Sequence, residues 1–464
     1  MTQPRGQWSG RMGFILAAAG SAIGLGNLWK FPYMTYENRG GAFVLVYIAA
    51  VVLVGVPIMM AEVLLGRRTR RCPVGAYLVA SEKRPGGRTW VSVGYLGVFA
   101  GFVILSYYSV VAGWTLDYIL LSLLGKLGPL ARDPAALQSY FVDGFLHNGW
   151  QQTIFHLLFM SLTVGSVYFG VKGGIERVAR VLMPVLFGIM LVLVIYSATT
   201  PGFGHAMRYL FRPSFSEMHS SGYLEAMGQA FFSLSLGMGC MLTYGSYMSS
   251  SSSIPRSVLQ ICALDTLIAI LACVIMFSII FSFDLQISAS ATILFTTLPT
   301  VLVQMPGGNF VIGLFYLLIA FAALTSTISL LEVVSSYAID ELHWSRRRAA
   351  LTMGTIIAIF GVLNAWSLGA SSALSRFNPL GKSSTTGLFS TLDYLSANWF
   401  LPVGGFLVAL FVGWILGRRA TRMELEEGHG VMAGYSLWRF LIRFVAPLAV
   451  GAIIVSVILG AEYQ

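Results

Sequence analysis

Charged residues are scarce in this chain, and their scarcity excludes an ordinary soluble protein. Only 10% of the 464 residues are charged, against 56% that are hydrophobic, whereas soluble domains carry about 25% charged residues. The mean hydropathy is +0.76, and the apolar residues form long runs such as 43–60 and 181–198. A helix needs a run of about 20 apolar residues to cross the hydrocarbon layer of a membrane. The composition therefore indicates a membrane protein with many spans.

Residues that commonly carry catalysis are also scarce. The four cysteines lie in one loop and in apolar runs, namely Cys72, Cys240, Cys262 and Cys273. We expect them to be small apolar fillers rather than metal ligands, and we expect no structural disulfide. The six histidines form no metal-ligand or nucleophile pattern, and there is no phosphate-binding loop of the form GxxxxGK followed by Ser or Thr. These absences argue against an enzyme and against an ATP-driven machine.

Eleven apolar segments are long enough to cross a membrane. They cover residues 12–35, 41–66, 89–124, 151–170, 175–198, 222–250, 257–284, 310–340, 347–367, 390–417 and 436–461. Because the backbone must satisfy its own hydrogen bonds in lipid, we predict an all-α polytopic membrane protein with about eleven transmembrane helices. Segment 286–309 is apolar but is interrupted by Pro299 and Pro306, so we expect a re-entrant or lid-like external loop; if it crosses, the count is twelve. The first span should be retained rather than cleaved as a signal peptide.

The net charge of +10 is concentrated on one side of the predicted membrane. Basic residues follow the second, eighth and tenth spans, at 67–71, 83–88, 346–348 and 418–422, whereas the loops of the opposite side carry few. This asymmetry follows the positive-inside rule and predicts a cytoplasmic N-terminus and an external C-terminus. It also accounts for the charge without a nucleic-acid partner. The bilayer is the expected partner, and no obligatory protein partner is inferred.

Two spans contain glycines and small hydroxyl residues at mid-membrane depth. The first reads AAAGSAIGLGN at 17–27, and the sixth reads FFSLSLGMG at 231–239. Close helix packing through small residues would explain either segment alone. However, the two segments occupy the first position of two blocks of five spans, and paired interruptions of this kind are typical of a transporter's binding site. We therefore predict discontinuous helices 1 and 6, whose freed backbone groups bind an anion and a cation.

These blocks define the expected organisation of the chain. Residues 1–464 form a single transmembrane domain, in which 1–200 is a first five-helix repeat and 222–417 is a second repeat of inverted topology. Residues 436–461 form an additional eleventh helix. No direct sequence repeat relates the halves, so the inverted repeat is inferred from the pairing of the interruptions.

The sequence around the interruptions resembles the neurotransmitter:sodium symporter family. The matching stretches are 8–11, 20–32, 37–43, 229–239, 324–327 and 340–342. The resemblance runs in order over nearly the whole chain, and the short form without a twelfth span is similar to the bacterial amino-acid members. It implies sodium-coupled uptake of amino acids by alternating access across a bacterial inner membrane.

The resemblance implies two sodium sites. One comprises the carbonyls of Gly20, Ile23 and Ala322 and the hydroxyls of Thr325 and Ser326. The other comprises the Ala22 carbonyl, the side chains of Asn27, Ser233 and Asp265, and the substrate carboxylate. Both sets consist of hard oxygen ligands, as a hard cation requires. Alternatively, the hydroxyls of Thr325 and Ser326 do not bind sodium and donate to carbonyls of their own helix.

The resemblance also implies the substrate site. The carboxylate would meet the N–H groups of Leu25 and Gly26 and the hydroxyl of Tyr108. The amine would meet Ala22, Phe232, Ser233 and Ser326. The side-chain pocket would comprise Ile104, Tyr108, Phe232, Ser235, Met238, Ser329 and Leu330.

Two positions of this pocket indicate the class of substrate. Relatives that carry monoamines have an aspartate where this chain has Gly24, so the substrate should bring its own carboxylate. Met238 replaces an aromatic residue of the leucine-carrying relative, and methionine adapts to several shapes. The pocket is mostly apolar, as small-molecule sites usually are. We therefore expect a large hydrophobic or aromatic L-amino acid such as tryptophan, tyrosine, phenylalanine or leucine.

Chloride-dependent relatives hold an anion near one of the sodium ions. Tyr47, Gln229 and Ser233 match that cage, but Ala269 stands where those relatives have a serine. Asp265 already supplies a fixed negative charge in a membrane-buried position, where an ionisable group is expected to be functional. We therefore predict transport that needs sodium but not chloride.

Charged and aromatic residues on either side of the site match the gates of the family. The outer gate would be Lys30 with Asp393, above Tyr108 and Phe232. The inner gate would be Arg5, Trp8, Ser246, Tyr247 and Asp340. Lys30 replaces the more usual arginine, which leaves a point charge instead of a bidentate fork. Two further membrane carboxylates are either structural or proton-linked: Glu62, expected to bond to the unwound part of the sixth span near Ser235, and Glu332, whose partner is not assigned.

Three other functions remain open from the sequence. A proton-coupled amino-acid carrier or a betaine carrier of the same five-plus-five architecture would transport without sodium. A membrane-embedded enzyme would need a catalytic constellation that the histidines do not supply. A sensor or channel would not accumulate its solute. Uptake with and without sodium separates these alternatives.

Overall fold

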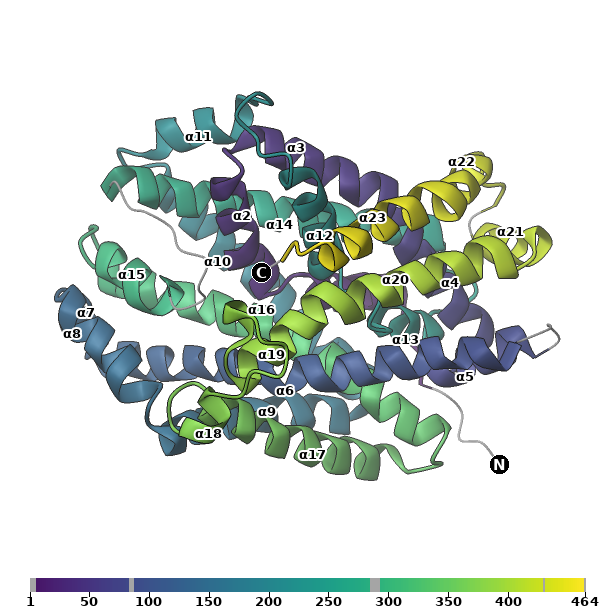
Figure 1. Cartoon of the computed structure of the whole chain (residues 1–464), viewed down its shortest axis with the longest axis horizontal. Helices are drawn as coiled ribbons and strands as arrows, with labels where there is room; N and C mark the ends of the chain where they lie inside the picture. Colours follow the sequence, from purple (N-terminus) through teal and green to yellow (C-terminus); the bar gives the residue numbers. More distant parts are fainter. Residues whose placement is uncertain (1–5, 83–86, 284–292, 429, 463–464) are drawn as a thin grey trace.

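The computed structural model describes residues 6–82, 87–283, 293–428 and 430–462, which form helices joined by turns, with no strand among them. Within this part of the chain, eight helical segments are long and apolar enough to cross a membrane: Gly41–Thr69, Gly87–Leu123, Val171–Ser197, Ile254–Phe283, Gly308–Asp340, Arg346–Trp366, Leu388–Ile415 and Tyr435–Ile458. Three of them each consist of one uninterrupted α-helix, namely α14 (Ile254–Phe283), α16 (Gly308–Asp340) and α17 (Arg346–Trp366). The long helices run roughly parallel across Figure 1.

The other five segments contain short π- or 3-10-helical turns. They consist of α3 (Gly41–Ala50), η2 (Val51–Gly55) and α4 (Val56–Thr69); η3 (Gly87–Trp90) and α6 (Val91–Leu123); η5 (Val171–Ile175) and α10 (Glu176–Ser197); α19 (Leu388–Leu395), η7 (Ser396–Phe400), α20 (Leu401–Leu410) and η8 (Phe411–Ile415); and α22 (Tyr435–Phe440), η9 (Leu441–Val445) and α23 (Ala446–Ile458). Their bounds differ by a few residues from the apolar runs of the sequence, because helices continue past the hydrocarbon layer.

Two further spans are broken helices, as predicted. In the first, α1 (Arg11–Ala22) is followed by η1 (Gly26–Lys30) and α2 (Phe31–Glu37), and the two parts are bent by 54°. In the sixth, α12 (Gly222–Ser233) and α13 (Cys240–Ser246) are separated by the non-helical residues 234–239. Within that gap Gly237 has a φ of 81°, and a Cβ there would lie 2.3 Å from the Leu401 carbonyl oxygen. Only glycine meets both demands.

The fourth predicted span is α9 (Gly149–Tyr168). It has 20 residues, but it is less apolar than the eight segments above because Gln151, Gln152 and His156 lie in its first half. Gln152 and His156 are buried and bond to the carbonyls of Ala365 and Ala358 in the region of α17. With α9 and the two broken helices, the helices of the described chain occupy all eleven predicted stretches, of which eight, or nine with the bent first pair, are long and apolar enough to cross a membrane.

Short helices lie at the two ends of the bundle. One end, the left side of Figure 1, carries α7 (Leu127–Ala131), α8 (Pro134–Gln138), η4 (Ser139–Phe145), α11 (Phe203–Phe211) and α15 (Ile293–Leu302), and we call it the α15 end. The other carries α5 (Pro73–Ser81) and α21 (Arg418–Glu426), and we call it the α5 end. Two small elements, α18 (Ser372–Ser375) and η6 (Ser383–Thr385), connect α17 to α19.

The segment predicted to be re-entrant is described only in part. Residues 286–292 lie outside the described residues, and the remainder forms α15, which packs against α7, α8 and α16. Its 10 residues span about 15 Å at 1.5 Å per residue, half of the hydrocarbon thickness. The helix is therefore too short to be a twelfth span.

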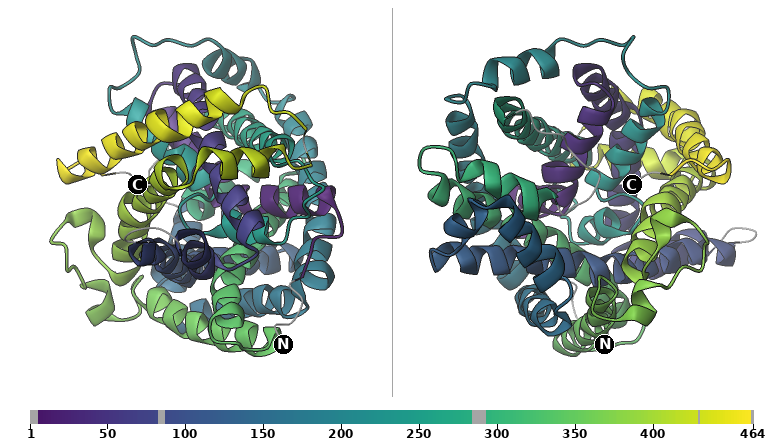
Figure 2. Two further views of the ribbon diagram at one scale, coloured as in Figure 1. Left: turned by 90° about the vertical axis from the view of Figure 1, so that its right-hand side faces the viewer. Right: turned by 60° about the vertical axis from the view of Figure 1, so that its left-hand side comes forward.

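The two helix breaks lie inside the bundle. The first half of the broken first span packs against α10, α14 and α16, while α13 packs against α4 and α12 packs against α3 and α20. The turned views in Figure 2 show the long helices surrounding these segments. Helices α6 and α16 make the most extensive contact of the fold, and they supply the wall that faces both breaks.

Candidate functional site

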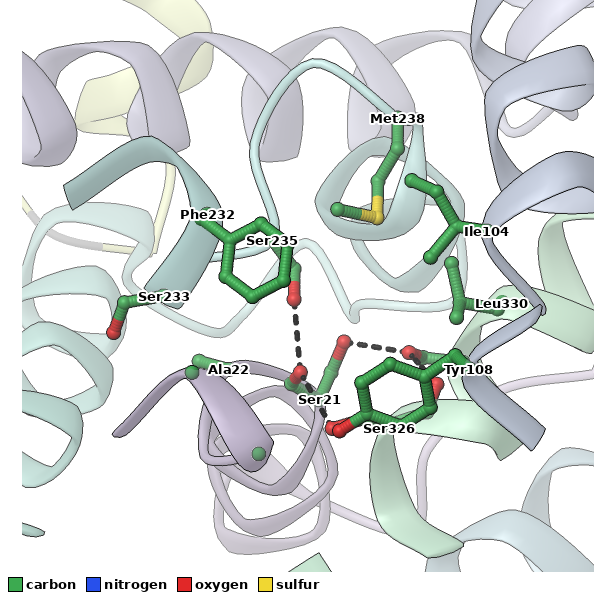
Figure 3. Close-up of a pocket in the computed structure, with 13 residues that line it drawn as sticks. Ser21, Ala22, Ile104, Tyr108, Phe232, Ser233, Ser235, Met238, Ser326 and Leu330 are labelled. Carbon is green, nitrogen blue, oxygen red and sulfur yellow. Dashed lines mark hydrogen bonds between the residues drawn. The ribbon is translucent and has the colours of Figure 1, made fainter. Parts of the chain in front are cut away.

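A cavity lies between the two helix breaks and the middle of α6 and α16 (Figure 3). Its free volume is about 30 Å³, and its lining residues are Ser21, Ala22, Gly24, Gly26, Ile104, Tyr108, Phe232, Ser233, Ser235, Met238, Ser326, Ser329 and Leu330. The structure thus brings together every residue that the sequence assigned to the substrate, except Leu25. Ser21 is the one lining residue that the sequence analysis missed.

Hydroxyl groups join the break of the first span to α16 and to the gap of the sixth span across one side of this cavity. Ser21 Oγ donates to Ser329 Oγ at 2.7 Å, and Ser235 Oγ donates to the Ser21 carbonyl oxygen at 2.8 Å. Figure 3 shows the bond between Ser235 and Ser21 below the apolar side chains of Ile104 and Met238. Ser21 directly precedes Ala22, the last residue of α1. A hydroxyl beside the predicted break could have identified Ser21 from the sequence.

The break in the first span is held close to α6 and α16. The Leu25 N–H donates to the Tyr108 hydroxyl at 3.0 Å. A Cβ on Gly24 would lie 2.8 Å from both the Ser326 hydroxyl and the Tyr108 hydroxyl, and a Cβ on Gly26 would lie 2.8 Å from the Phe232 ring. No side chain fits at either glycine without moving these neighbours.

A buried polar cluster surrounds Asp265 beside the same break. Asn27 Nδ2 donates to Asp265 Oδ1 at 2.8 Å, Ser233 Oγ donates to Oδ2 at 2.7 Å, and the Tyr47 hydroxyl donates to Oδ2 at 3.2 Å. Asn27 Oδ1 accepts the Gly24 N–H at 3.2 Å. The side chains of Asn27, Tyr47, Ser233 and Asp265 are at most 1% exposed. The cluster contains the carboxylate, amide and hydroxyl oxygens that suit a hard cation.

The second set of oxygens lies where α16 meets α1. Ser326 Oγ is 3.2 Å from the Ala322 carbonyl oxygen and 3.4 Å from that of Ile23. Thr325 Oγ1 is 3.0 Å from the Ala322 carbonyl oxygen. Both hydroxyls donate to carbonyls of their own helix, which was the alternative to a sodium-ligand role. The Ser326 hydroxyl also reaches the unwound end of α1. A Cβ on Gly20 would lie 3.0 Å from the Thr325 side chain, so a glycine allows this close approach.

The residues matched to a chloride cage lie around the same cluster. Tyr47 Oη also lies 3.1 Å from Ser233 Oγ, and Gln229 Nε2 donates to the Gly26 carbonyl oxygen at 3.0 Å. Ala269 is fully buried and has no group that could donate to an anion. The Asp265 carboxylate already occupies the donors of Tyr47 and Ser233.

On the side of the cavity toward the α15 end, Phe232 separates the cavity from Lys30. The Lys30 ammonium lies 4.5 Å from the centre of the Phe232 ring and is 7% exposed. Asp393 interacts with it electrostatically, yet these two described residues make no nitrogen–oxygen contact within 4.0 Å. The charged pair predicted as an outer gate is therefore near but not in direct contact, and Lys30 makes a cation–π contact instead.

Toward the α5 end, Trp8 covers the region below the cavity. Its indole N–H donates to the Tyr244 carbonyl oxygen at 2.9 Å, and its ring is 6.1 Å from that of Tyr247. Ser246 Oγ donates to the Thr243 carbonyl oxygen at 2.5 Å, within α13. These contacts tie the N-terminal segment to the second half of the broken sixth span.

The carboxylates of this region have partners in other helices. Asp340 Oδ2 accepts the Cys72 N–H at 2.6 Å, whereas Arg5, its predicted partner, lies outside the described residues. Glu332 is fully buried and accepts hydrogen bonds from Tyr247 at 2.5 Å and from Arg346 at 2.8 and 2.9 Å. The partner of Glu332 that the sequence left open is thus an arginine at the start of α17.

Glu62 supports the gap of the sixth span from α4. Its Oε1 accepts the Gly237 N–H at 2.8 Å, two residues beyond the predicted Ser235. The side chain is 1% exposed. A buried carboxylate thus satisfies one of the backbone groups that unwinding leaves without an intrahelical partner.

Comparison with known proteins identifies the family. A sequence profile of the Sodium:neurotransmitter symporter family matches residues 5–131 and 141–463. The chain belongs to this family. It is 36% identical to an uncharacterized sodium-dependent transporter of Bacillus subtilis, YhdH, over 97% of both chains. It is 28% identical to an uncharacterized sodium-dependent transporter of Methanocaldococcus jannaschii, MJ1319, over 97% of this chain and 90% of that one.

A solved structure supports the fold of this symporter. The crystal structure of MhsT in complex with L-phenylalanine has 38% sequence identity and a TM-score of 0.87, and the match covers 98% of this chain and 100% of that one. The symporter is therefore a sodium-dependent transporter in a membrane. In its described part no three His, Cys, Asp or Glu side chains gather as a metal centre would require.

Proposed function

We propose that this symporter couples sodium entry to the uptake of large hydrophobic or aromatic L-amino acids and does not require chloride. The observation that carries the proposal is the cavity between the two helix breaks, in which backbone and hydroxyl groups lie on one side and apolar side chains on the other. MhsT, with which the chain aligns along its length, was crystallised with L-phenylalanine.

The substrate's carboxylate is proposed to bind at the first break. The Gly26 N–H lies just beyond the end of α1, and the Tyr108 hydroxyl approaches from α6. The Leu25 N–H, which donates to that hydroxyl, becomes available if the tyrosine turns to the ligand. Gly24 carries no side chain that would press on the Tyr108 and Ser326 hydroxyls beside this position. The carbonyls of Ala22 and Phe232 and the hydroxyls of Ser233 and Ser326 would receive the amine.

The substrate's side chain is proposed to lie against the apolar wall. Ile104, Phe232, Met238 and Leu330 supply this wall, and methionine adapts to side chains of different shape. The Ser21–Ser329 hydroxyl pair lies in the same lining. It gives the pocket a polar point that an indole N–H or a phenol hydroxyl can use.

Two sodium ions are proposed to use the two oxygen sets. One would lie among the carbonyls of Gly20, Ile23 and Ala322 and the hydroxyls of Thr325 and Ser326. The other would lie among Ala22, Asn27, Ser233, Asp265 and the substrate carboxylate, so that substrate and ion bind together. One charge crossing 100 mV releases about 2.3 kcal/mol, so two ions support accumulation of a zwitterion on the order of a thousandfold.

The orientation of the protein follows from its basic loops. We propose that the α5 end, which carries the arginines of 67–71, 346–348 and 418–422, faces the cytoplasm of a bacterial cell and that the α15 end faces outward. Lys30, Asp393, Phe232 and Tyr108 would then form the outer gate, and Trp8, Ser246, Tyr247, Asp340 and Arg5 the inner one. Residues 1–200 and 222–417 would be the two inverted repeats, with 436–461 as an additional helix.

Uptake into proteoliposomes tests this function directly. We expect concentrative uptake of tryptophan, tyrosine, phenylalanine or leucine when a sodium gradient is imposed and no accumulation when choline replaces sodium. The panel includes all twenty amino acids, so the preferred substrate is identified in the same experiment. Equal accumulation in choline, driven by a proton gradient, would instead favour the proton-coupled alternative.

Chloride replacement is expected to leave uptake almost unchanged. The Asp265 carboxylate supplies the negative charge beside the proposed sodium ion, and Ala269 offers an anion no donor. The measurement is the initial rate of substrate uptake with sodium gluconate in place of sodium chloride on both sides of the vesicle. A large loss of rate, restored by adding back chloride, contradicts this prediction.

A further inference from the structure

The junction between η8 and η9 combines exposed aromatic rings with arginines at the α5 end of the bundle. At this junction the two final spans approach closely, because a Cβ on Gly413 would lie 3.0 Å from the Ile442 carbonyl oxygen. Trp414, Phe440 and Phe444 are 48%, 54% and 42% exposed. Since both spans belong to a membrane protein, these rings face lipid at the level where aromatic residues meet the head groups.

Arg443 is held in this junction without a hydrogen-bond acceptor. Its guanidinium lies 4.1 Å from the centre of the Trp414 ring and 5.7 Å from that of Phe444. Its Nε is buried and has no partner in the described part of the chain. The Trp414 indole N–H donates to the Arg443 carbonyl oxygen at 2.9 Å, which fixes the ring beside the charge. The more exposed nitrogens of this half-buried guanidinium can donate to an acceptor from outside the protein.

Two more arginines add to this positive charge. Arg439 donates to the carbonyl oxygens of Val412 at 2.9 Å and Leu416 at 3.0 Å, so it caps the end of the tenth span. Arg418, which is exposed at the start of α21, and Arg443 both repel its charge. The acidic residues of α21 are engaged elsewhere: Glu424 pairs with Arg67, and Glu426 pairs with Arg422.

We propose that Arg418, Arg439 and Arg443, with Trp414, bind the phosphate of an anionic phospholipid. The lipid phosphate accepts hydrogen bonds from Arg443, and its charge offsets the repulsion that Arg418 and Arg443 exert on Arg439. The exposed rings of Phe440 and Phe444 contact the acyl region of the same lipid. A lipid suits this site better than a soluble anion because the site opens toward the membrane between two spans. The proposal depends on the membrane location and not on the transported substrate.

Quenching of tryptophan fluorescence by brominated lipid tests the site. The protein is placed in nanodiscs of phosphatidylcholine that contain increasing fractions of dibromo-phosphatidylglycerol, and the signal of Trp414 is obtained by subtracting that of the Trp414→Phe variant. We expect half-maximal quenching of Trp414 at a much lower fraction of brominated phosphatidylglycerol than of brominated phosphatidylcholine. Each arginine near an anionic surface contributes about fivefold in affinity, so the preference should reach on the order of a hundredfold.

The variants separate this site from general surface charge. Arg418→Gln with Arg443→Gln removes two charges but keeps the helix-capping bonds of Arg439, and it should raise the half-maximal fraction about 25-fold. The matched control is Arg347→Gln, which removes an arginine stacked 5.3 Å from the Tyr168 ring at the same end of the bundle. Size-exclusion profiles confirm that each variant is folded. Equal quenching by the two brominated lipids, or equal effects of the site and control variants, would overturn the proposal.

Discussion

Replacing Gly24 by alanine is expected to lower amino-acid affinity by on the order of 100-fold and to remove most sodium-driven uptake. The added Cβ would lie 2.8 Å from two hydroxyl oxygens, those of Ser326 and Tyr108. Both residues belong to long, packed helices that cannot withdraw freely, and overpacking of this kind costs about 1–3 kcal/mol. The methyl group also presses on Tyr108 and Ser326, which we propose to contact the substrate, so the loss falls on binding more than on folding.

The control for this variant is a glycine with room for a side chain. Gly188, in α10, is also in a transmembrane helix, but a Cβ there meets nothing within 4 Å. Gly188→Ala should therefore keep both uptake and substrate affinity. Binding of radiolabelled substrate to detergent-solubilised protein, with the thermal melting temperature measured in parallel, distinguishes lost binding from lost folding. Near-normal affinity in Gly24→Ala would rule out the proposed carboxylate position.

The helix breaks could be predicted because their cause is local in the sequence. Glycines at 24, 26, 237 and 239 within apolar runs mark positions where a helix is weak. The same runs defined the spans, because the hydrocarbon layer imposes one minimum length on all of them. The resemblance to a family then assigned roles, and the structure brought the assigned substrate residues, except Leu25, around one cavity.

Other features depend on partners that no local pattern reveals. Arg67 was counted with the loop charges, yet it is 2% exposed and its guanidinium lies 2.5 Å from the carboxylate of Glu424, 357 positions away. The pairing of Glu332 with Arg346 depends likewise on how α16 turns into α17. The Lys30 contact with Phe232 could not be predicted, since a flexible lysine chooses between a ring and a carboxylate by packing.

Asp265→Asn is expected to raise the sodium concentration needed for half-maximal uptake by about 10- to 150-fold. The carboxylate accepts from Asn27 on one oxygen and from Ser233 and Tyr47 on the other. An amide has only one accepting oxygen, so its NH₂ group would face donors that already point at it. It also lacks the charge that balances the proposed ion. Hydrogen bonds to a charged group contribute about 1.5–3 kcal/mol, which corresponds to the stated range.

A second buried aspartate provides the control for this change. Asp117 in α6 is 3% exposed and accepts from the Tyr140 hydroxyl at 2.9 Å, but it belongs to neither oxygen set. Asp117→Asn removes the same charge from a similarly buried place, so it should leave the sodium dependence unchanged even if stability falls. Sodium titrations of uptake in proteoliposomes compare the two variants. If both shift the sodium requirement equally, the effect arises from general destabilisation, and the assignment of Asp265 to a sodium site fails. If only Asp265→Asn shifts it, the carboxylate acts on the ion itself, because burial and charge are matched between the two positions.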